Sequence, residues 1–429
     1  MTSILTRQSK TNAPTIQQFD NGLTIIAEQM PVEAVNLNVW INVGSVKESN
    51  EINGMAHFLE HMVFKGTSNL AIGQFEQLIE ERGAVTNAAT SQDYTHYYIT
   101  TAPQDFATLA PLQLDVLLNP SLEDQAFERE KLVVLEEIRR SEDSPLRRAF
   151  RRSMETCFES LPYRRPVLGP AEVISNLRSQ QMRDFHSAWY QPPSMTAAVV
   201  GNLPVNELID IVTQSYEQHY NQRQQQPKNR VPEATPEPVF TEIVRREYID
   251  ATLQQARLIM VWRVPGMETP EQTYALDILS VILGQGKVSR LFRELREEKG
   301  LVTHVGVSNL TQTHQGAFYI SAALPEEHIA EVEQAIAEQI RKLQTEPIAA
   351  KDIDRIRTQV ANRFIFANER PSDRANLYGY YYSQLQDLAP ALDYPQRIQS
   401  ISVADLQTAA TKYLNPEAYG VVVMKPDPK

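Results

Sequence analysis

The feature that most constrains this chain is a faint internal repeat, because it requires a unit that occurs twice within 429 residues. Val39-Trp40-Ile41 recurs as Val261-Trp262-Arg263 about 220 positions later. Tyr190-Gln191-Pro192 has a counterpart in Tyr413-Leu414-Asn415-Pro416 at a similar spacing. Similar offsets at the two ends of a unit predict duplication of a domain of about 190–220 residues.

A Gln- and Pro-rich segment separates the two units. Residues 221–238 read NQRQQQPKNRVPEATPEP and hold too few apolar side chains to build a core. We interpret this segment as an interdomain hinge. The sequence therefore predicts an N-terminal domain over 1–220, a linker over 221–240 and a C-terminal domain over 241–429.

Within the first unit, strand patterns come early and long helical patterns follow. Asp20-Asn21-Gly22 between two strand-like runs indicates a β-hairpin. Residues 84–90 and 94–101 have strand-like patterns, and helical periodicity follows at 104–118, 124–140, 145–160 and 178–190. This order favours an α+β fold with two homologous domains, each a mainly antiparallel sheet with helices packed on one face.

Composition excludes several classes of protein. The formal net charge of −12 argues against binding to the phosphate backbone of nucleic acids, which requires a positively charged surface. The single cysteine, Cys157, cannot form an intramolecular disulfide or a cysteine-based zinc site. No apolar run reaches the length of a transmembrane helix, and the first residues lack the apolar core of a secretory signal. We therefore expect a cytoplasmic protein that binds neither membranes nor nucleic acid.

The motif His57-Phe58-Leu59-Glu60-His61 is the strongest chemical signal. Positions i and i+4 of a helix share a face, so His57 and His61 can bind one metal ion. Glu60 lies on the same flank, where its carboxylate can reach a water molecule at the metal. A catalytic zinc ion takes three protein ligands and keeps one position open, so a third ligand must come from elsewhere.

Acidic residues of the helical segment 124–140 are the candidates for that third ligand. Glu130 and Glu137 are seven residues apart and therefore share a helix face. One carboxylate could complete the site while the other braces it. Spacing alone does not choose between Glu136 and Glu137, nor does it exclude Glu130.

These motifs resemble the pitrilysin family of zinc metallopeptidases. The inverted order His-x-x-Glu-His is the inverzincin signature. The segments GMAHFLEHMVFKGT (54–67), NAATSQDYTHYY (87–98), EREKLVVLEEI (128–138) and SRLFRELREEKGL (289–301) resemble the same family. The chain is most similar to its short members, related to the β-subunit of the mitochondrial processing peptidase, and the similarity covers nearly the whole chain.

The resemblance implies a role for each candidate residue. Glu137 would be the third zinc ligand, and Glu130 would be the supporting glutamate of the catalytic site. Glu60 would be the general base. Asn87 and Ala88 would lie near the scissile bond, on a strand whose open edge pairs with the extended substrate. The expected function is thus a zinc-dependent endopeptidase that hydrolyses peptides or unfolded segments.

One position departs from the family pattern. Many relatives use an Arg and, seven residues later, a Tyr of the second domain to hold the substrate. Here the Arg is Arg296, but the Tyr position holds Thr303, whose side chain is too short to replace it. We therefore expect the catalytic subunit of a dimeric chamber, as a heterodimer with a paralogue that supplies the Arg–Tyr pair or, alternatively, as a homodimer. A second alternative is a non-catalytic binding or assembly subunit.

Overall fold

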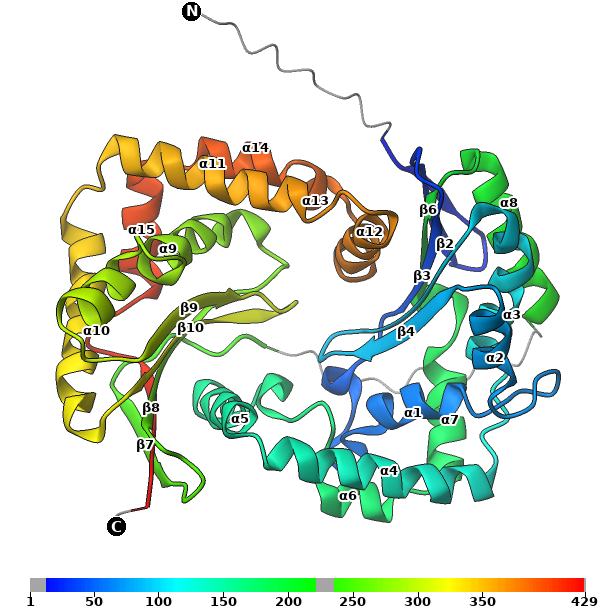
Figure 1. Cartoon of the computed structure of the whole chain (residues 1–429), viewed down its shortest axis with the longest axis horizontal. Coiled ribbons are helices and arrows are strands. Elements are labelled where there is room, and N and C mark those ends of the chain that lie inside the picture. Colours follow the sequence, from blue (N-terminus) through cyan, green and yellow to red (C-terminus); the bar gives the residue numbers. More distant parts are fainter. Residues whose placement is uncertain (1–12, 221–234, 428–429) are drawn as a thin grey trace, which may run out of the picture.

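The computed structural model describes residues 13–220 and 235–427, which form two halves, each built on one β-sheet (Figure 1). Most of the predicted linker, residues 221–234, lies outside the described residues. None of the helices within the described ranges is long and apolar enough to cross a membrane.

The N-terminal sheet has the strand order β1-β2-β6-β3-β5-β4, in which only β2 and β6 run parallel. Its strands are β1 (Thr15–Gln18), β2 (Thr24–Gln29), β3 (Val35–Ile41), β4 (Val85–Thr90), β5 (Thr95–Thr101) and β6 (Met195–Gly201). The predicted hairpin is confirmed, since Asp20-Asn21-Gly22 lies in the turn between β1 and β2 and Gly22 has a φ of +93°.

The C-terminal sheet has the order β7-β11-β8-β10-β9, in which only β7 and β11 run parallel. Its strands are β7 (Val244–Ile249), β8 (Ala256–Pro265), β9 (His304–Leu310), β10 (Gln315–Leu324) and β11 (Gly420–Lys425). The order matches β2-β6-β3-β5-β4 of the first sheet, including the place of the parallel pair. The prediction of an α+β fold made of two mainly antiparallel, related domains is confirmed.

Helices are interspersed with the strands in each half. In the first half they are α1 (Met55–Val63), α2 (Gln74–Glu81), α3 (Phe106–Leu118), α4 (Asp124–Glu142), α5 (Pro145–Cys157), α6 (Ala171–Asn176), α7 (Ser179–Trp189) and α8 (Val205–His219). In the second half they are α9 (Tyr274–Gly284), α10 (Ile329–Thr345), α11 (Ala350–Phe366), α12 (Pro371–Leu385), α13 (Ala389–Leu392), α14 (Tyr394–Ser400) and α15 (Val403–Tyr413).

The sequence matches that suggested the repeat are each one residue out of structural register. In β3, Val39 faces the core of its own half and Trp40 faces the opposite side, whereas Trp262 of β8 lies in its own core. Likewise Tyr190 caps the end of α7, but the residue that caps α15 is Leu414. The duplication is real, yet a slip of one residue reverses the face of every strand side chain, so these matched letters are not equivalent positions.

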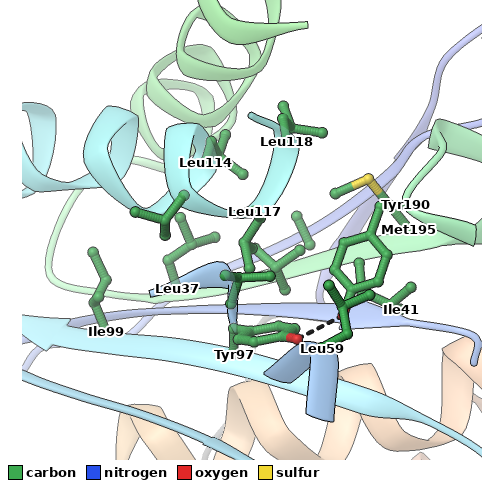
Figure 2. Close-up of a cluster of buried hydrophobic side chains, with 14 of the residues drawn as sticks. Leu37, Ile41, Leu59, Tyr97, Ile99, Leu114, Leu117, Leu118, Tyr190 and Met195 are labelled. Carbon is green, nitrogen blue, oxygen red and sulfur yellow. Dashed lines mark hydrogen bonds between the residues drawn. The ribbon is translucent and has the colours of Figure 1, made fainter. Parts of the chain in front are cut away.

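The first core packs helices α1, α3 and α7 against one face of the N-terminal sheet (Figure 2). Leu59, in the middle of the His-x-x-Glu-His motif, is fully buried there among Leu37, Ile41 and Leu117. The apolar residues of α1 therefore pack into this core, and its polar side chains lie on the helix face that points away from the core.

The second face of each sheet is covered by a helix of the other half (Figure 1). Helix α12 lies on β3 and β6 of the N-terminal sheet, and α5 lies on β8 and β11 of the C-terminal sheet. Within each domain, helices pack on one face of the sheet, as expected. The opposite face is covered by the helix from the other half.

The described end of the linker is anchored at this interface. The carboxylate of Glu237 accepts hydrogen bonds from the backbone N–H groups of Glu159, Ser160 and Leu161 at 2.7–2.9 Å. It also pairs at 2.9 Å with Arg263, a buried cation of β8. The contact of the two halves is therefore specific and polar as well as apolar.

Gly379 of α12 is expected to be essential for this docking, because the helix approaches β3 too closely for a side chain. A Cβ atom at Gly379 would lie 1.9 Å from Nε1 of the buried Trp40. Alanine favours a helix over glycine by about 1 kcal/mol, yet we expect Gly379→Ala to lower the free energy of unfolding by about 1–3 kcal/mol. Urea unfolding measures this change.

Asn376→Ala, at an exposed position of the same helix, is the matched control and should change stability by less than about 0.5 kcal/mol. Gly379→Ala should cost less in a Trp40→Phe background, where the ring is smaller. An equal cost in both backgrounds would contradict the proposed contact.

Candidate metal centre

Helix α1 is held at its start by a buried carboxylate. Glu48 accepts hydrogen bonds from the backbone N–H groups of Gly54 and Ala56, both at 2.7 Å, and from the side chain of Asn53 at 2.8 Å. An anion at a helix N-terminus satisfies free N–H groups and interacts favourably with the helix dipole. Glu48 thereby fixes the orientation of the helix that carries the motif.

Helix α4 crosses α1 and brings a third side chain to its two histidines. Oε2 of Glu137 lies 3.5 Å from Nε2 of His57 and 3.4 Å from Nε2 of His61. Among residues 13–220 and 235–427, these three form the one cluster of His, Cys, Asp or Glu side chains that could hold a metal ion. Glu136 points away and pairs with Arg139 on the exposed side of α4, so the choice left open by spacing falls on Glu137.

The donor set fits zinc. Two imidazole nitrogens and one carboxylate oxygen are typical of catalytic zinc sites. A tetrahedral ion with bonds of about 2.0–2.2 Å holds its ligand atoms about 3.3–3.5 Å apart. The distances of 3.5 and 3.4 Å from Oε2 of Glu137 to the two Nε2 atoms agree with this spacing. In addition, the pKa of Glu137 is lowered, chiefly by its hydrogen bond with His61, so the carboxylate is ionised.

Glu130 acts on His61 rather than on the ion. Its Oε1 lies 2.9 Å from Nδ1 of His61, and its Oε2 lies 2.8 Å from Nζ of Lys65. A carboxylate on one ring nitrogen fixes the tautomer and leaves the other nitrogen, Nε2, free to bind metal. Glu130, expected to be part of the catalytic site, thus contacts the side of the His61 ring that faces away from Glu137.

The two histidines differ in their charge when no ion is bound. Burial, assisted by the charge of His61, lowers the pKa of His57 to about 4. Burial acts in the same direction on His61, but hydrogen bonds with Glu130 and Glu137 outweigh it and raise the pKa to about 9. The two carboxylates thus stabilise positive charge at the position where a metal cation would bind.

Glu60 lies outside the ligand cluster but in the same cavity. This cavity, of about 990 Å³, is lined by His57, Glu60, Thr90 and Glu137 among others. The hydroxyl of Thr90 donates a hydrogen bond to Oε2 of Glu60. Burial raises the pKa of Glu60 despite that bond. A half-buried carboxyl group in the same cavity as three potential ligands is suited to accept and release a proton.

Strand β4, which carries Asn87 and Ala88, is an edge of the N-terminal sheet, as the sequence predicted for the substrate strand. The N–H of Ala88 donates to the side-chain Oδ1 of Asn87 at 2.9 Å. Ala89 and Thr90, at the end of the strand, line the metal cavity. An extended peptide added to this edge would lead toward the candidate metal centre.

Arg296 is not brought to the centre. It lies in a short π-helical segment of the second half (Phe292–Glu298), and its guanidinium stacks on the ring of Phe292 at 4.9 Å. It is absent from the residues that line the cavity. Thr303 is engaged elsewhere, because its hydroxyl donates to Gln255 at 2.7 Å.

Three contributors escaped the sequence analysis. Glu48 bonds the backbone at the start of α1, Lys65 pairs with Glu130, and Thr90 donates to Glu60. None of the three belongs to a periodic pattern or a recognised spacing, and Lys65 lies beyond the end of α1, so no sequence signal pointed to them.

Two family models match the chain. Residues 23–171 match "Insulinase (Peptidase family M16)", and residues 176–360 match "Peptidase M16 inactive domain". Between them these models span well over half of the chain. The His-x-x-Glu-His motif and Glu130 and Glu137 of α4 lie within the first match.

Similar proteins are named zinc proteases. Zinc protease PqqE of Helicobacter pylori is 28% identical over 416 residues, which cover 95% of this chain and 91% of that protein. The uncharacterized zinc protease YmxG of Bacillus subtilis is 27% identical over 361 residues, 84% of this chain and 85% of that protein.

Solved structures show the same architecture. The crystal structure of a protease from Helicobacter pylori superposes with a TM-score of 0.90 at 28% identity, covering 96% of this chain and 99% of that chain. A peptidase M16 inactive domain from Pseudomonas fluorescens, at 18% identity, matches in fold with a TM-score of 0.85, over 97% of this chain and 98% of that one. By its two domains, its motif and these relatives, the chain belongs to peptidase family M16.

Proposed function

We propose that this chain is a zinc-dependent endopeptidase that hydrolyses peptides or unfolded segments. The observation that carries the proposal is the convergence of His57, His61 and Glu137, with Glu60 in the same cavity. A non-catalytic binding subunit would have no need of the half-buried, hydrogen-bonded carboxyl group of Glu60. The relatives named zinc proteases support the same reading.

The chemistry follows from the geometry. Zinc held by His57, His61 and Glu137 would supply Lewis acidity, which makes a water molecule more acidic and polarises the scissile carbonyl. Glu60 would take the proton of the attacking water and later deliver it to the leaving amine. The hydrogen bond from Thr90 orients the carboxylate for both transfers.

The open edge of β4 favours an extended peptide as substrate. Main-chain hydrogen bonds to a sheet edge supply affinity without regard to side chains. A folded protein presents few free strands, so this mode of binding restricts substrates to peptides and unfolded segments. Asn87 and Ala88 would contact the substrate backbone near the scissile bond.

We infer further that a paralogous subunit completes the site. The position where many relatives carry a tyrosine is Thr303, whose hydroxyl already bonds Gln255 and the carbonyl of Ala323. An Arg–Tyr pair from a second chain would supply the missing contact to the substrate carbonyl.

Replacement of the third ligand should abolish zinc binding. Glu137→Gln removes the anionic ligand, so we expect a loss of zinc affinity of at least about 100-fold. Glu130→Gln should weaken affinity by about 10–100-fold, because it frees the ring of His61. Competition with a chromogenic chelator measures both. Glu136→Gln, one residue away on the exposed side, is the control, and a wild-type affinity for Glu137→Gln would rule out the ligand assignment.

Removal of the general base should separate metal binding from turnover. Glu60→Gln keeps the three ligands, so the variant should hold zinc at wild-type stoichiometry. Its kcat should fall by about 10²–10⁴-fold, because the proton acceptor is lost. Elemental analysis and cleavage of quenched fluorescent peptides measure the two quantities. Cleavage at the parental rate would show that another group is the base.

The activity of the chain alone tests the need for a partner. We expect the purified, zinc-loaded chain to cleave a quenched peptide pool slowly, and a chelator to abolish this cleavage. Addition of a paralogue that carries the Arg–Tyr pair should raise the rate and form a complex in size-exclusion chromatography. Full activity without a partner, at the mass of a dimer, would instead identify a homodimer.

A further inference from the structure

The metal cavity extends from the ligands along helix α5. Its wall there is formed by Leu146, Arg147 and Phe150, all of them exposed to the cavity or to solvent. Leu146 is 63% exposed and Phe150 39% exposed, which is unusual for side chains of this size. This wall adjoins Glu137 and Glu60 and is available to a bound peptide.

Most cations of the cavity already have partners. The arginines that line it are Arg147, Arg151, Arg152, Arg164 and Arg165. Arg151 pairs with Glu142 and Glu155, Arg152 pairs with Glu155, and Arg164 and Arg165 donate to backbone carbonyl groups. These four side chains are neutralised or fixed by the fold.

Arg147 differs from them. Within residues 13–220 and 235–427, its guanidinium makes no hydrogen bond or ion pair; only its backbone N–H bonds, to Ser144. Arg147 also lies in the first turn of α5, where the helix dipole disfavours a cation. Its charge interacts through space with the carboxylate of Glu137, without a hydrogen bond or ion pair between them. A cation that breaks a local rule without a directly bonded partner is often kept for function.

We propose that Arg147 binds a carboxylate of the substrate, so that this chain prefers peptides with an acidic group near the scissile bond. The inference rests on the proposed peptidase function and adds a determinant of specificity to it. A guanidinium can bind a carboxylate through two parallel hydrogen bonds. The apolar surface of Leu146 and Phe150 displaces water beside it, which strengthens the ion pair.

The carboxylate that binds Arg147 could belong to either of two groups of the substrate. It can be the side chain of Asp or Glu within a peptide, or the α-carboxylate of a peptide that ends in the cavity. In either case the ion pair forms in the ground state as well as in the transition state, so it should act on KM more than on kcat.

Binding to the zinc-loaded Glu60→Gln variant tests the inference without turnover. The probes are fluorescent host peptides of equal length that carry Glu, Gln or Lys at successive positions and end in an amide. A second set has the same sequences with a free C-terminus. We expect the Glu peptide to bind about tenfold more tightly than the Gln peptide at one position, with a preference that declines as salt rises. Arg147→Met in this background should remove the preference, and Arg147→Glu should transfer it to the Lys peptide.

Arg140→Met is the matched control, because it removes the same charge from the outer side of α4, outside the cavity. It should keep the preference for Glu. A preference only for peptides with a free C-terminus would identify the α-carboxylate as the ligand. Equal binding of Glu and Gln peptides, with no gain from a free C-terminus, or no binding of any peptide, would overturn the role of Arg147.

Cleavage assays with Glu60 intact separate this inference from the proposed function. Peptide cleavage at equal kcat/KM for Glu and Gln substrates, in wild type and Arg147→Met alike, would overturn the role of Arg147 and leave the peptidase standing. Selective binding without any cleavage would support the role of Arg147 while the peptidase proposal fails.

Discussion

Each sheet of this chain buries both faces, and the second face of each is covered by a helix of the other half. Helix α12 packs on the N-terminal sheet so closely that Gly379 contacts the ring of Trp40, and α5 packs on the C-terminal sheet. Burial of apolar surface is the main favourable term in folding, so this exchange holds the two halves at a defined separation. The positions of the side chains that line the space between the halves depend on this packing of α5 and α12.

The metal cavity is one consequence. Helix α5 buries one side against the C-terminal sheet and presents the other to the cavity, next to the end of α4. Helix α4 in turn supplies Glu137 to the histidines of α1 and Glu130 to the far side of His61. The candidate ligands, the proposed general base and the proposed carboxylate-binding arginine thus come from three helices, of which α1 packs on α4 and α4 on α5. A displacement of any of these helices would change the separations that the metal requires.

Much of the fold and site followed from local patterns. The i, i+4 spacing of His57 and His61 and the seven-residue spacing of Glu130 and Glu137 are properties of a single helix, which sequence alone specifies. The same local reasoning failed where register matters across a sheet: Trp40 and Trp262 match in letters but lie on opposite faces of their strands. It also could not show that Arg296 lies outside the cavity or that Thr90 bonds Glu60, because both depend on chain segments far apart in sequence.

By itself, the sequence determined two related α+β units, a helix with a metal-binding face and a short set of acidic residues that could complete the site. These are consequences of periodicity and spacing within one element. The family resemblance implied Glu137 and Glu130, but only the tertiary structure shows that Glu137 rather than Glu136 meets the histidines and that Glu130 contacts His61. Only the tertiary structure shows, too, that Arg147 lines the cavity and makes no hydrogen bond or ion pair through its guanidinium with any described residue. The physical reason is that the direction of a side chain is set by its helix, but what it meets is set by which helix or sheet packs against that face.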